Sequence, residues 1–167
     1  MKKKKNNDFK IGEIVVYPKH GVGEIKKIES MEIGSIKTRF YLVQMEQAKL
    51  MIRVPLDKQN EVGLRKIASK KILDDVFTTL KLKPKIRRIM WSRRAQEYDA
   101  KIFSGDPLKI AEVVRDLFRK NTQAEQSYSE RQMFQIAIER LARELAAVEK
   151  TDYFQSTEKI ETILRNK

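Results

Sequence analysis

The stretch Ser69–Leu80, SKKILDDVFTTL, is where the hydrophobic pattern of the chain changes from that of strands to that of a helix. Its apolar residues recur at the spacing of one face of an α-helix. Ser69 stands directly before this repeat and can accept hydrogen bonds from the first free amides of the helix. The stretch therefore predicts the first helix of a helical region. The residues expected on its buried face are Ile72, Leu73, Val76, Phe77 and Leu80.

Before about residue 65, short β-branched and aromatic runs are separated by turn residues such as Pro18, Gly21 and Gly34-Ser35. This pattern is typical of short strands joined by tight turns, and it predicts a small antiparallel barrel or sheet. An edge of such a sheet can accept a strand from a partner. The expected strands are Glu13–Tyr17, Gly23–Ile28, Thr38–Met45 and Leu50–Val54.

After Leu80 the pattern stays helical. A second helix should include Trp91 and end near Phe103, and Asp106-Pro107 marks the start of a third, since Asp caps helices and Pro fits their first turn. Ser129 with Gln132 suggests a capping box for a fourth helix, and a last short helix is expected over 157–164. Core faces are expected at Ile110, Val113, Val114, Leu117 and Phe118, and at Met133, Ile136, Ala137, Leu141, Leu145 and Val148. The chain thus predicts an α+β fold, with a β domain over residues 8–66 and a helical bundle over 67–167.

Composition narrows the function classes. The net charge of +13 and the pI near 9.9 favour a polyanionic partner: nucleic acid, an anionic membrane or an acidic protein. No cysteine is present, and no apolar run approaches the roughly 20 residues of a membrane span. The single histidine, His20, has no cluster of possible metal ligands or catalytic partners around it. We therefore expect no catalysis, no metal and no cofactor.

The densest positive charge lies between Lys81 and Arg94, where no acidic residue occurs. The basic residues there are Lys81, Lys83, Lys85, Arg87, Arg88, Arg93 and Arg94. Trp91, the only tryptophan, lies among them. A tryptophan usually belongs to the core, but its basic neighbours, and Ile89 and Met90 as alternative apolar contacts, favour an exposed indole. An exposed indole beside arginines can stack on a base or wedge into a base step.

Several motifs, in order along the chain, closely resemble the CarD family of bacterial transcription regulators. The resemblance covers about residues 8–165. In the helical half the motifs are Trp91-Ser92-Arg93-Arg94, Ser104-Gly105-Asp106 and Ala111-Glu112-Val113-Val114-Arg115-Asp116-Leu117. In the first half they are Phe9-Lys10-Ile11-Gly12, Val15-Val16-Tyr17-Pro18, His20-Gly21-Val22-Gly23, Tyr41-Leu42-Val43 and Arg53-Val54-Pro55.

The resemblance implies a Tudor-like N-terminal domain, shared with the transcription-repair coupling factor, that docks on the RNA polymerase β subunit through a strand edge. It implies a helical C-terminal domain at the upstream edge of the transcription bubble, where Trp91 is the wedge that stabilises the open complex. By position, Arg93 matches a DNA-contacting arginine and Arg94 is its basic neighbour. Arg53 matches a polymerase-contacting arginine.

Two positions depart from the family pattern. Gln96 stands where a DNA-contacting lysine is common, and we expect the basic run Lys81–Arg88 to compensate, with Lys85, Arg87 and Arg88 among the DNA-binding residues. Met31 stands where the polymerase-facing strand often carries an arginine, and we expect the segment Met31-Glu32-Ile33 to pair through its backbone.

The sequence thus indicates a cytoplasmic, nucleoid-associated monomer that binds RNA polymerase and promoter DNA with little base specificity. The alternative is an adaptor whose basic segment meets an acidic protein partner.

Overall fold

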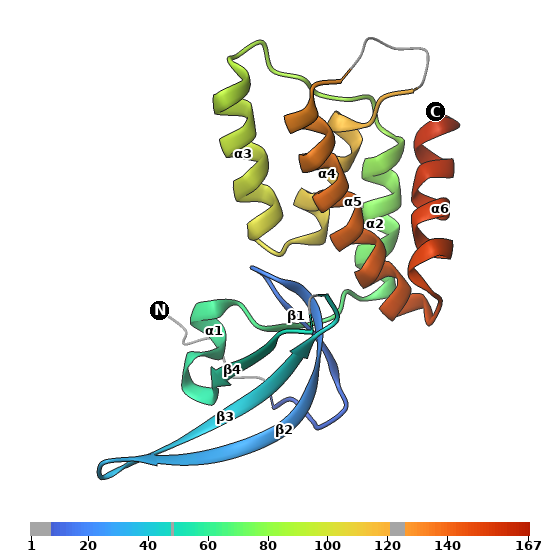
Figure 1. The fold of residues 1–167 in the computed structure, drawn as a ribbon. Helices are drawn as coiled ribbons and strands as arrows, with labels where there is room; N and C mark the ends of the chain where they lie inside the picture. The colour runs from blue at the N-terminus through green and yellow to red at the C-terminus, as the bar shows by residue number, and fades with distance from the viewer. Residues whose placement is uncertain (1–7, 48, 121–125) are drawn as a thin grey trace. The chain divides into compact units, whose positions relative to one another are not determined.

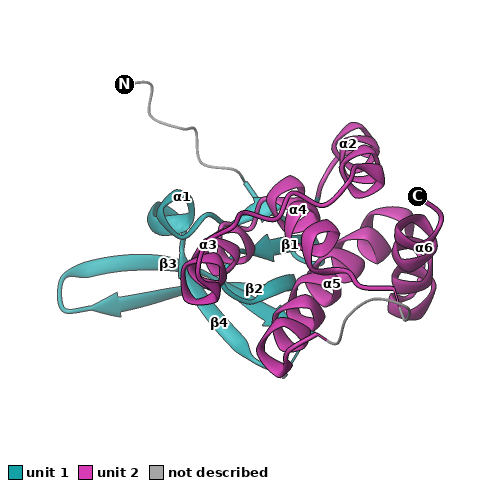
Figure 2. Ribbon diagram, turned by 90° about the horizontal axis from the view of Figure 1, so that it is seen from above, with its two compact units in different colours: residues 1–67 teal, residues 68–167 magenta. Residues whose placement is uncertain are grey.

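The computed structural model describes residues 8–47, 49–120 and 126–167. The chain forms two compact units, Met1–Ile67 and Ala68–Lys167, which Figure 2 colours separately. The first unit is built on an antiparallel sheet and the second is entirely helical in its described part. The predicted α+β class, with strands first and a helical bundle after them, is confirmed.

The sheet of the first unit has five strands in the order β4-β3-β2-β1-β5, and all neighbouring strands are antiparallel. Figure 1 shows β2 and β3 as one long hairpin. A single 3-10 turn (Leu56–Lys58) and a short helix α1 (Gln59–Val62) connect β4 to β5. The strands are β1 (Ile14–Tyr17), β2 (Gly21–Ile33), β3 (Ile36–Met45), β4 (Met51–Pro55) and β5 (Arg65–Lys66).

The β2–β3 hairpin is longer than the sequence predicted. β2 continues past Ile28 to Ile33, and β3 begins at Ile36 because the two strands are joined by only two residues, Gly34 and Ser35. Gly34 has a φ of 65°, which a two-residue hairpin loop needs at its first position. The predicted strand ends at Ile28, and the residues of β2 beyond Glu29 are exposed in the first unit.

The core of the first unit lies on one face of the sheet and includes Phe9 from the segment before β1. Its buried members are Phe9, Val15, Ile25, Tyr41, Val43, Met45, Val54 and Leu64. The Phe9 amide donates a hydrogen bond to the Tyr41 hydroxyl, 3.3 Å away, and the two rings meet edge to face. Gly23 lies where β2 comes closest to β3: a Cβ there would stand 2.9 Å from Val43 Cγ1 and 3.0 Å from the Gln44 carbonyl oxygen.

We expect Gly23→Ala to destabilise the first unit by about 1–3 kcal/mol, because the added methyl group overpacks the contact with β3. Urea denaturation followed by circular dichroism measures the loss. Ser30→Ala, an exposed change in the same strand, should stay within about 0.5 kcal/mol of the parent. Equal stability of the two variants would contradict the close approach.

The second unit contains helices α2 (Lys70–Lys81), α3 (Trp91–Phe103), α4 (Pro107–Leu117), α5 (Tyr128–Glu149) and α6 (Tyr153–Arg165). Helix α4 is central: it contacts α2, α3 and α5, while α6 packs against α5 and α2. Eight of its eleven residues are buried, including the charged pair Arg115 and Asp116. No helix in the described part of the chain is long and apolar enough to cross a membrane.

Helix starts agree with the sequence in two places and differ in two. Ser69 caps α2, and Asp106 caps α4 with Pro107 at its first position, as predicted. The second helix was predicted to include Trp91, and α3 begins at that residue. The capping box at Ser129 is wrong, because the cap of α5 is Ser127, whose hydroxyl accepts from the Glu130 amide. The last helix starts earlier than residue 157, since Asp152 caps it.

Two predicted core residues of the helical unit are wrong: Ile72 and Ile136 are exposed at 37% and 45%. Both stand beside the buried stripe of their helices, so the pattern alone placed them inside it. The buried face of α5 includes Ile138 and Ala142, which were not among the predicted core residues. Phe118 lies just past the end of α4 and packs on the core with Phe134, their ring centroids 6.1 Å apart.

Candidate nucleic-acid interface

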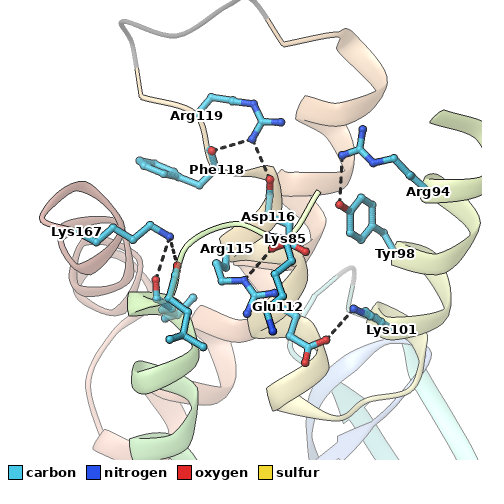
Figure 3. Close-up of polar contacts among 12 residues, drawn as sticks. Lys85, Arg94, Tyr98, Lys101, Glu112, Arg115, Asp116, Phe118, Arg119 and Lys167 are labelled. Carbon is cyan, nitrogen blue, oxygen red and sulfur yellow. Dashed lines mark hydrogen bonds and ion pairs between the residues drawn. The ribbon is translucent and has the colours of Figure 1, made fainter. Parts of the chain in front are cut away.

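The basic segment 82–90 links α2 to α3 without regular secondary structure, yet it is fixed at two points. The Lys85 amide donates to Asp116 Oδ1 at 2.9 Å. Nearer its start, Lys167 Nζ donates to the carbonyl oxygens of Leu80 and Leu82 at 3.2 and 2.9 Å. Figure 3 labels Lys85, Asp116 and Lys167, the residues of these contacts. The segment therefore presents its charges from a defined path.

Asp116 is the buried partner in the hydrogen bond from the Lys85 amide. Its Oδ1 also accepts from Arg115 Nε at 2.8 Å, and both side chains are almost wholly buried. A buried charge is costly unless it is paired and hydrogen-bonded. Asp116 meets that requirement partly through the Lys85 amide. The position of the basic segment and the stability of the buried pair therefore depend on each other.

Trp91 begins α3, and its indole is half-buried against the helical core. Its Nε1 donates to Ser129 Oγ on α5 at 3.2 Å, and the Tyr98 ring lies 6.3 Å away, centroid to centroid. The sequence favoured an exposed indole over a buried one, and the structure places the indole between the two. Met90 was expected to be an apolar contact that could replace it, but Met90 is 74% exposed.

Arg94 is directed at the indole. Its guanidinium carbon lies 5.4 Å from the Trp91 ring and 5.6 Å from the Tyr98 ring, and Nη2 donates to the Tyr98 hydroxyl at 3.3 Å. These three side chains share one face of α3 at helical spacing. Cation–π contacts of this kind contribute about 0.5–2 kcal/mol. Arg94 therefore holds the tryptophan in place.

Other basic side chains between Lys81 and Arg94 lie outside the cluster of Trp91, Arg94 and Tyr98. Arg87 forms an ion pair with Glu97 on α3. Lys85, Arg88 and Arg93 are exposed, and none forms an ion pair with a described residue. Their charges are thus open to a partner, whereas the charge of Arg87 is partly offset.

The first turn of α3 has the wrong charge for a helix. Negative side chains stabilise the N-terminal end of a helix dipole and positive ones oppose it. Here the first turn carries Arg93 and Arg94, no acidic residue, and no side-chain cap, since Met90 precedes it. A partner that brings negative charge to this end would remove the conflict.

The residues expected to meet the polymerase lie on the first unit. In the register of the sheet, Arg53 is level with Leu42 and Lys27. Because side chains alternate along a strand, Arg53 shares the non-core face of the sheet with Met31 and Ile33, whereas Glu32 faces the other way.

At the end of the hairpin, the side chains of that face are apolar and exposed in the first unit. Met31 is 46% exposed, Ile33 62% and Ile36 67%, at the end of the hairpin. Arg53 is also exposed, and its pair with Glu29 spans 3.6 Å, so it contributes little to stability. β1 pairs with β2 only as far as Glu24, so the backbone of Met31–Ile33 forms an edge among the described strands.

Sequence reasoning missed Ser129 and Tyr98 as parts of the tryptophan site. Tyr98 follows Trp91 by seven residues, which is a usable helical signal. Ser129 lies 38 residues away, and no local pattern connects it. Within the described part of the chain, no three His, Cys, Asp or Glu side chains gather as a metal site would require.

Because Trp91 is the only tryptophan, its fluorescence reports on this site alone. We expect Arg94→Ala to uncover the indole, to increase quenching by acrylamide and to reduce stability by about 0.5–2 kcal/mol through loss of the cation–π contacts. Arg93→Ala, which removes the adjacent exposed charge, should leave quenching unchanged. Equal quenching in both variants would argue against the role of Arg94.

Comparison with known proteins identifies the two halves of the chain. Residues 9–68 match the CarD-like/TRCF RID domain, and residues 75–161 match the CarD C-terminal domain. The "Putative transcription factor YdeB" of Bacillus subtilis (strain 168) is 30% identical over 140 residues, which cover 84% of this chain and 92% of that protein. The solved structure "CdnLNt from Myxoccoccus xanthus" is 35% identical and covers 41% of this chain and 96% of its own, with a TM-score of 0.33.

The two matched domains follow each other in the order of the strands and helices described above, and the relative from Bacillus subtilis matches across both of them. The chain therefore belongs to the CarD family of transcription regulators, and its residues 9–68 are the family's RNA polymerase-interacting domain.

Proposed function

We propose that this protein stabilises open promoter complexes, with the helical unit on DNA at the upstream edge of the transcription bubble and Trp91 as the wedge. The observation that carries this proposal is the cluster at the start of α3, where Arg94 and Tyr98 hold a half-buried indole next to unpaired arginines. A wedge must keep its shape while it enters a base step, because unstacking the step costs a few kcal/mol. An indole already held by Arg94, Tyr98 and Ser129 loses little further freedom on binding.

The charges around the wedge support DNA as its partner. Lys85, Arg88 and Arg93 are exposed without ion pairs to described residues, and the arginine-bearing first turn of α3 favours negative charge. Each phosphate that such a side chain neutralises lowers the logarithm of affinity by about 0.9 per tenfold rise in salt. No recognition helix distinguishes the site, so we expect contacts to backbone and fork with little base readout.

For the first unit, we assign the β subunit of RNA polymerase as the partner of the non-core sheet face. Exposed apolar side chains beside an open strand edge suit the addition of a strand. Arg53 lies on that face, and its weak pair with Glu29 leaves it available to a carboxylate of the polymerase. Glu32 would contribute only its backbone to this contact.

A basic adaptor that binds an acidic protein remains the second candidate, because exposed arginines suit carboxylates as well as phosphates. Binding to forked DNA and to plain duplex, each at two salt concentrations, separates the two. We expect tighter binding to the fork and a steep salt dependence. Equal binding to both DNAs would favour the adaptor.

Trp91→Ala should shorten the lifetime of open complexes by about tenfold or more, since one aromatic–base stack contributes about 1–3 kcal/mol. Competitor challenge of preformed complexes measures the lifetime. Phe103→Ala removes an exposed aromatic from the other end of the same helix and should leave the lifetime near that of the parent. An unchanged lifetime for Trp91→Ala on several promoters would rule out the wedge.

Arg53→Glu should weaken binding to the β subunit by about tenfold or more, because a charge reversal sets like charges against each other at the interface. Biolayer interferometry with the isolated β subunit measures the affinity. Lys66→Glu makes the same charge change on the opposite edge strand, β5, and should bind normally. DNA affinity should not change in either variant, and equal polymerase binding by both would remove Arg53 from the interface.

A further inference from the structure

A cavity of about 730 Å³ lies in the helical unit, formed by the end of α2, the basic segment, the residues after α4 and the end of α6. Its floor is apolar, made by Pro84, Ile86, Phe118 and Leu164. The volume is within the range of small-ligand sites, about 300–1,000 Å³. Trp91 does not line it, so the proposed wedge does not account for it.

The described rim of the cavity is positive. It carries Lys81, Lys83, Arg119, Lys120 and Lys167, and none of the described lining residues is acidic. Lys81 and Lys83 form no ion pair with a described residue. Lys120 is exposed, and its described contact is a long one, 3.4 Å, to the Lys167 carbonyl. These three amines can therefore turn toward a ligand.

The crowding of positive charge affects Lys167. Its pKa is lowered by burial and by the nearby charges of Arg115 and Lys120, and Asp116 only partly opposes this. Arg119 is engaged elsewhere, because its guanidinium donates to the carbonyls of Asp116 and Phe118 at 2.9 and 3.1 Å. Figure 3 shows the Phe118 ring and the Lys167 amine on the same side of α4. An anion in the cavity would relieve the repulsion.

The combination of several exposed amines with apolar lining residues selects the chemistry of the ligand. A single carboxylate needs one cation, whereas a phosphate group carries more charge and suits several. An aromatic ring offers a surface on which a nucleobase can stack. We propose that this cavity binds a nucleotide, with its base against Ile86 and Phe118 and its phosphates held by Lys81, Lys83 and Lys120.

The nucleotide can come from two sources, a free nucleoside triphosphate or a base of single-stranded DNA that enters the cavity. The first makes the protein responsive to a small molecule. The second extends the proposed DNA contact past the wedge and rests on the proposed function. Both place the same groups in the same cavity.

Binding of ATP to the full-length protein by calorimetry, at fixed salt, tests the site. ATP should bind more tightly than adenosine or tripolyphosphate, because each of these lacks one half of the contacts. Lys83→Glu with Lys120→Glu should weaken ATP binding by about tenfold or more, since it removes charge-assisted hydrogen bonds. Ile86→Ser should also weaken ATP binding while leaving tripolyphosphate unaffected.

The matched control is Lys71→Glu with Lys109→Glu, which makes the same change in net charge at exposed residues that do not line the cavity. Its ATP affinity should stay within about threefold of the parent. Equal loss in both double variants, or ATP binding no tighter than tripolyphosphate, would overturn the proposal, because either result reports nonspecific charge attraction.

A single-stranded oligonucleotide distinguishes the sources. If the cavity takes a DNA base, ATP should displace the oligonucleotide, and Lys83→Glu with Lys120→Glu should weaken its binding as well. If the cavity takes a free nucleotide, ATP and the oligonucleotide should bind together. Trp91→Ala should not alter ATP affinity, so a failed wedge and an empty cavity give different results.

Discussion

The buried pair of Arg115 and Asp116 is the interaction on which the rest of the helical unit depends. Taking both charges out of water is favourable only when their hydrogen bonds are complete. Asp116 completes its own with Arg115 and with the Lys85 amide. The basic segment has no regular structure of its own, so this requirement of the core determines its path. The hydrogen bond from the Lys85 amide also fixes the residues that precede Trp91, and hence the entry of the chain into α3.

The start of α3 departs in several ways from the residue preferences of helix N-termini. The first turn of α3 has no side-chain cap, carries two arginines where acids are preferred, follows an exposed methionine and holds a half-buried tryptophan. Elsewhere in the unit the rules are obeyed: Ser69, Asp106, Ser127 and Asp152 all cap their helices. Sequences that are locally consistent over most of a fold tend to break the rules where they bind or react. The contrast singles out the start of α3 more sharply than charge density alone.

Much of this fold follows from local patterns in the sequence. The Ser104-Gly105 pair indicated the end of α3 at Phe103, and the Asp-Pro pair indicated the start of α4, because both signals lie in the sequence at the helix ends. The errors arise where contacts with residues distant in sequence determine the role or the burial of a side chain. Ser129 looks like a cap by spacing, but its hydroxyl accepts from the Trp91 indole, 38 residues earlier. Ile136 fits the apolar stripe of α5, yet no neighbouring helix covers it. The burial of Trp91 depends on Ser129 and Tyr98 together, so its neighbours in sequence could not reveal it.

The two units together explain why the charge at the tryptophan site can be modest. Of the seven basic residues from Lys81 to Arg94, Arg87 is paired with Glu97 and Arg94 is directed at the indole, so five remain to attract a polyanionic partner. Such a site alone would bind weakly and lose affinity quickly as salt rises. In the proposed function, docking of the first unit on the polymerase makes the DNA contact effectively intramolecular, and effective concentrations in the millimolar range offset weak intrinsic affinity. Under that condition the rigid placement of Trp91 contributes more than added charge would, because the contact need only distinguish an open junction from closed duplex.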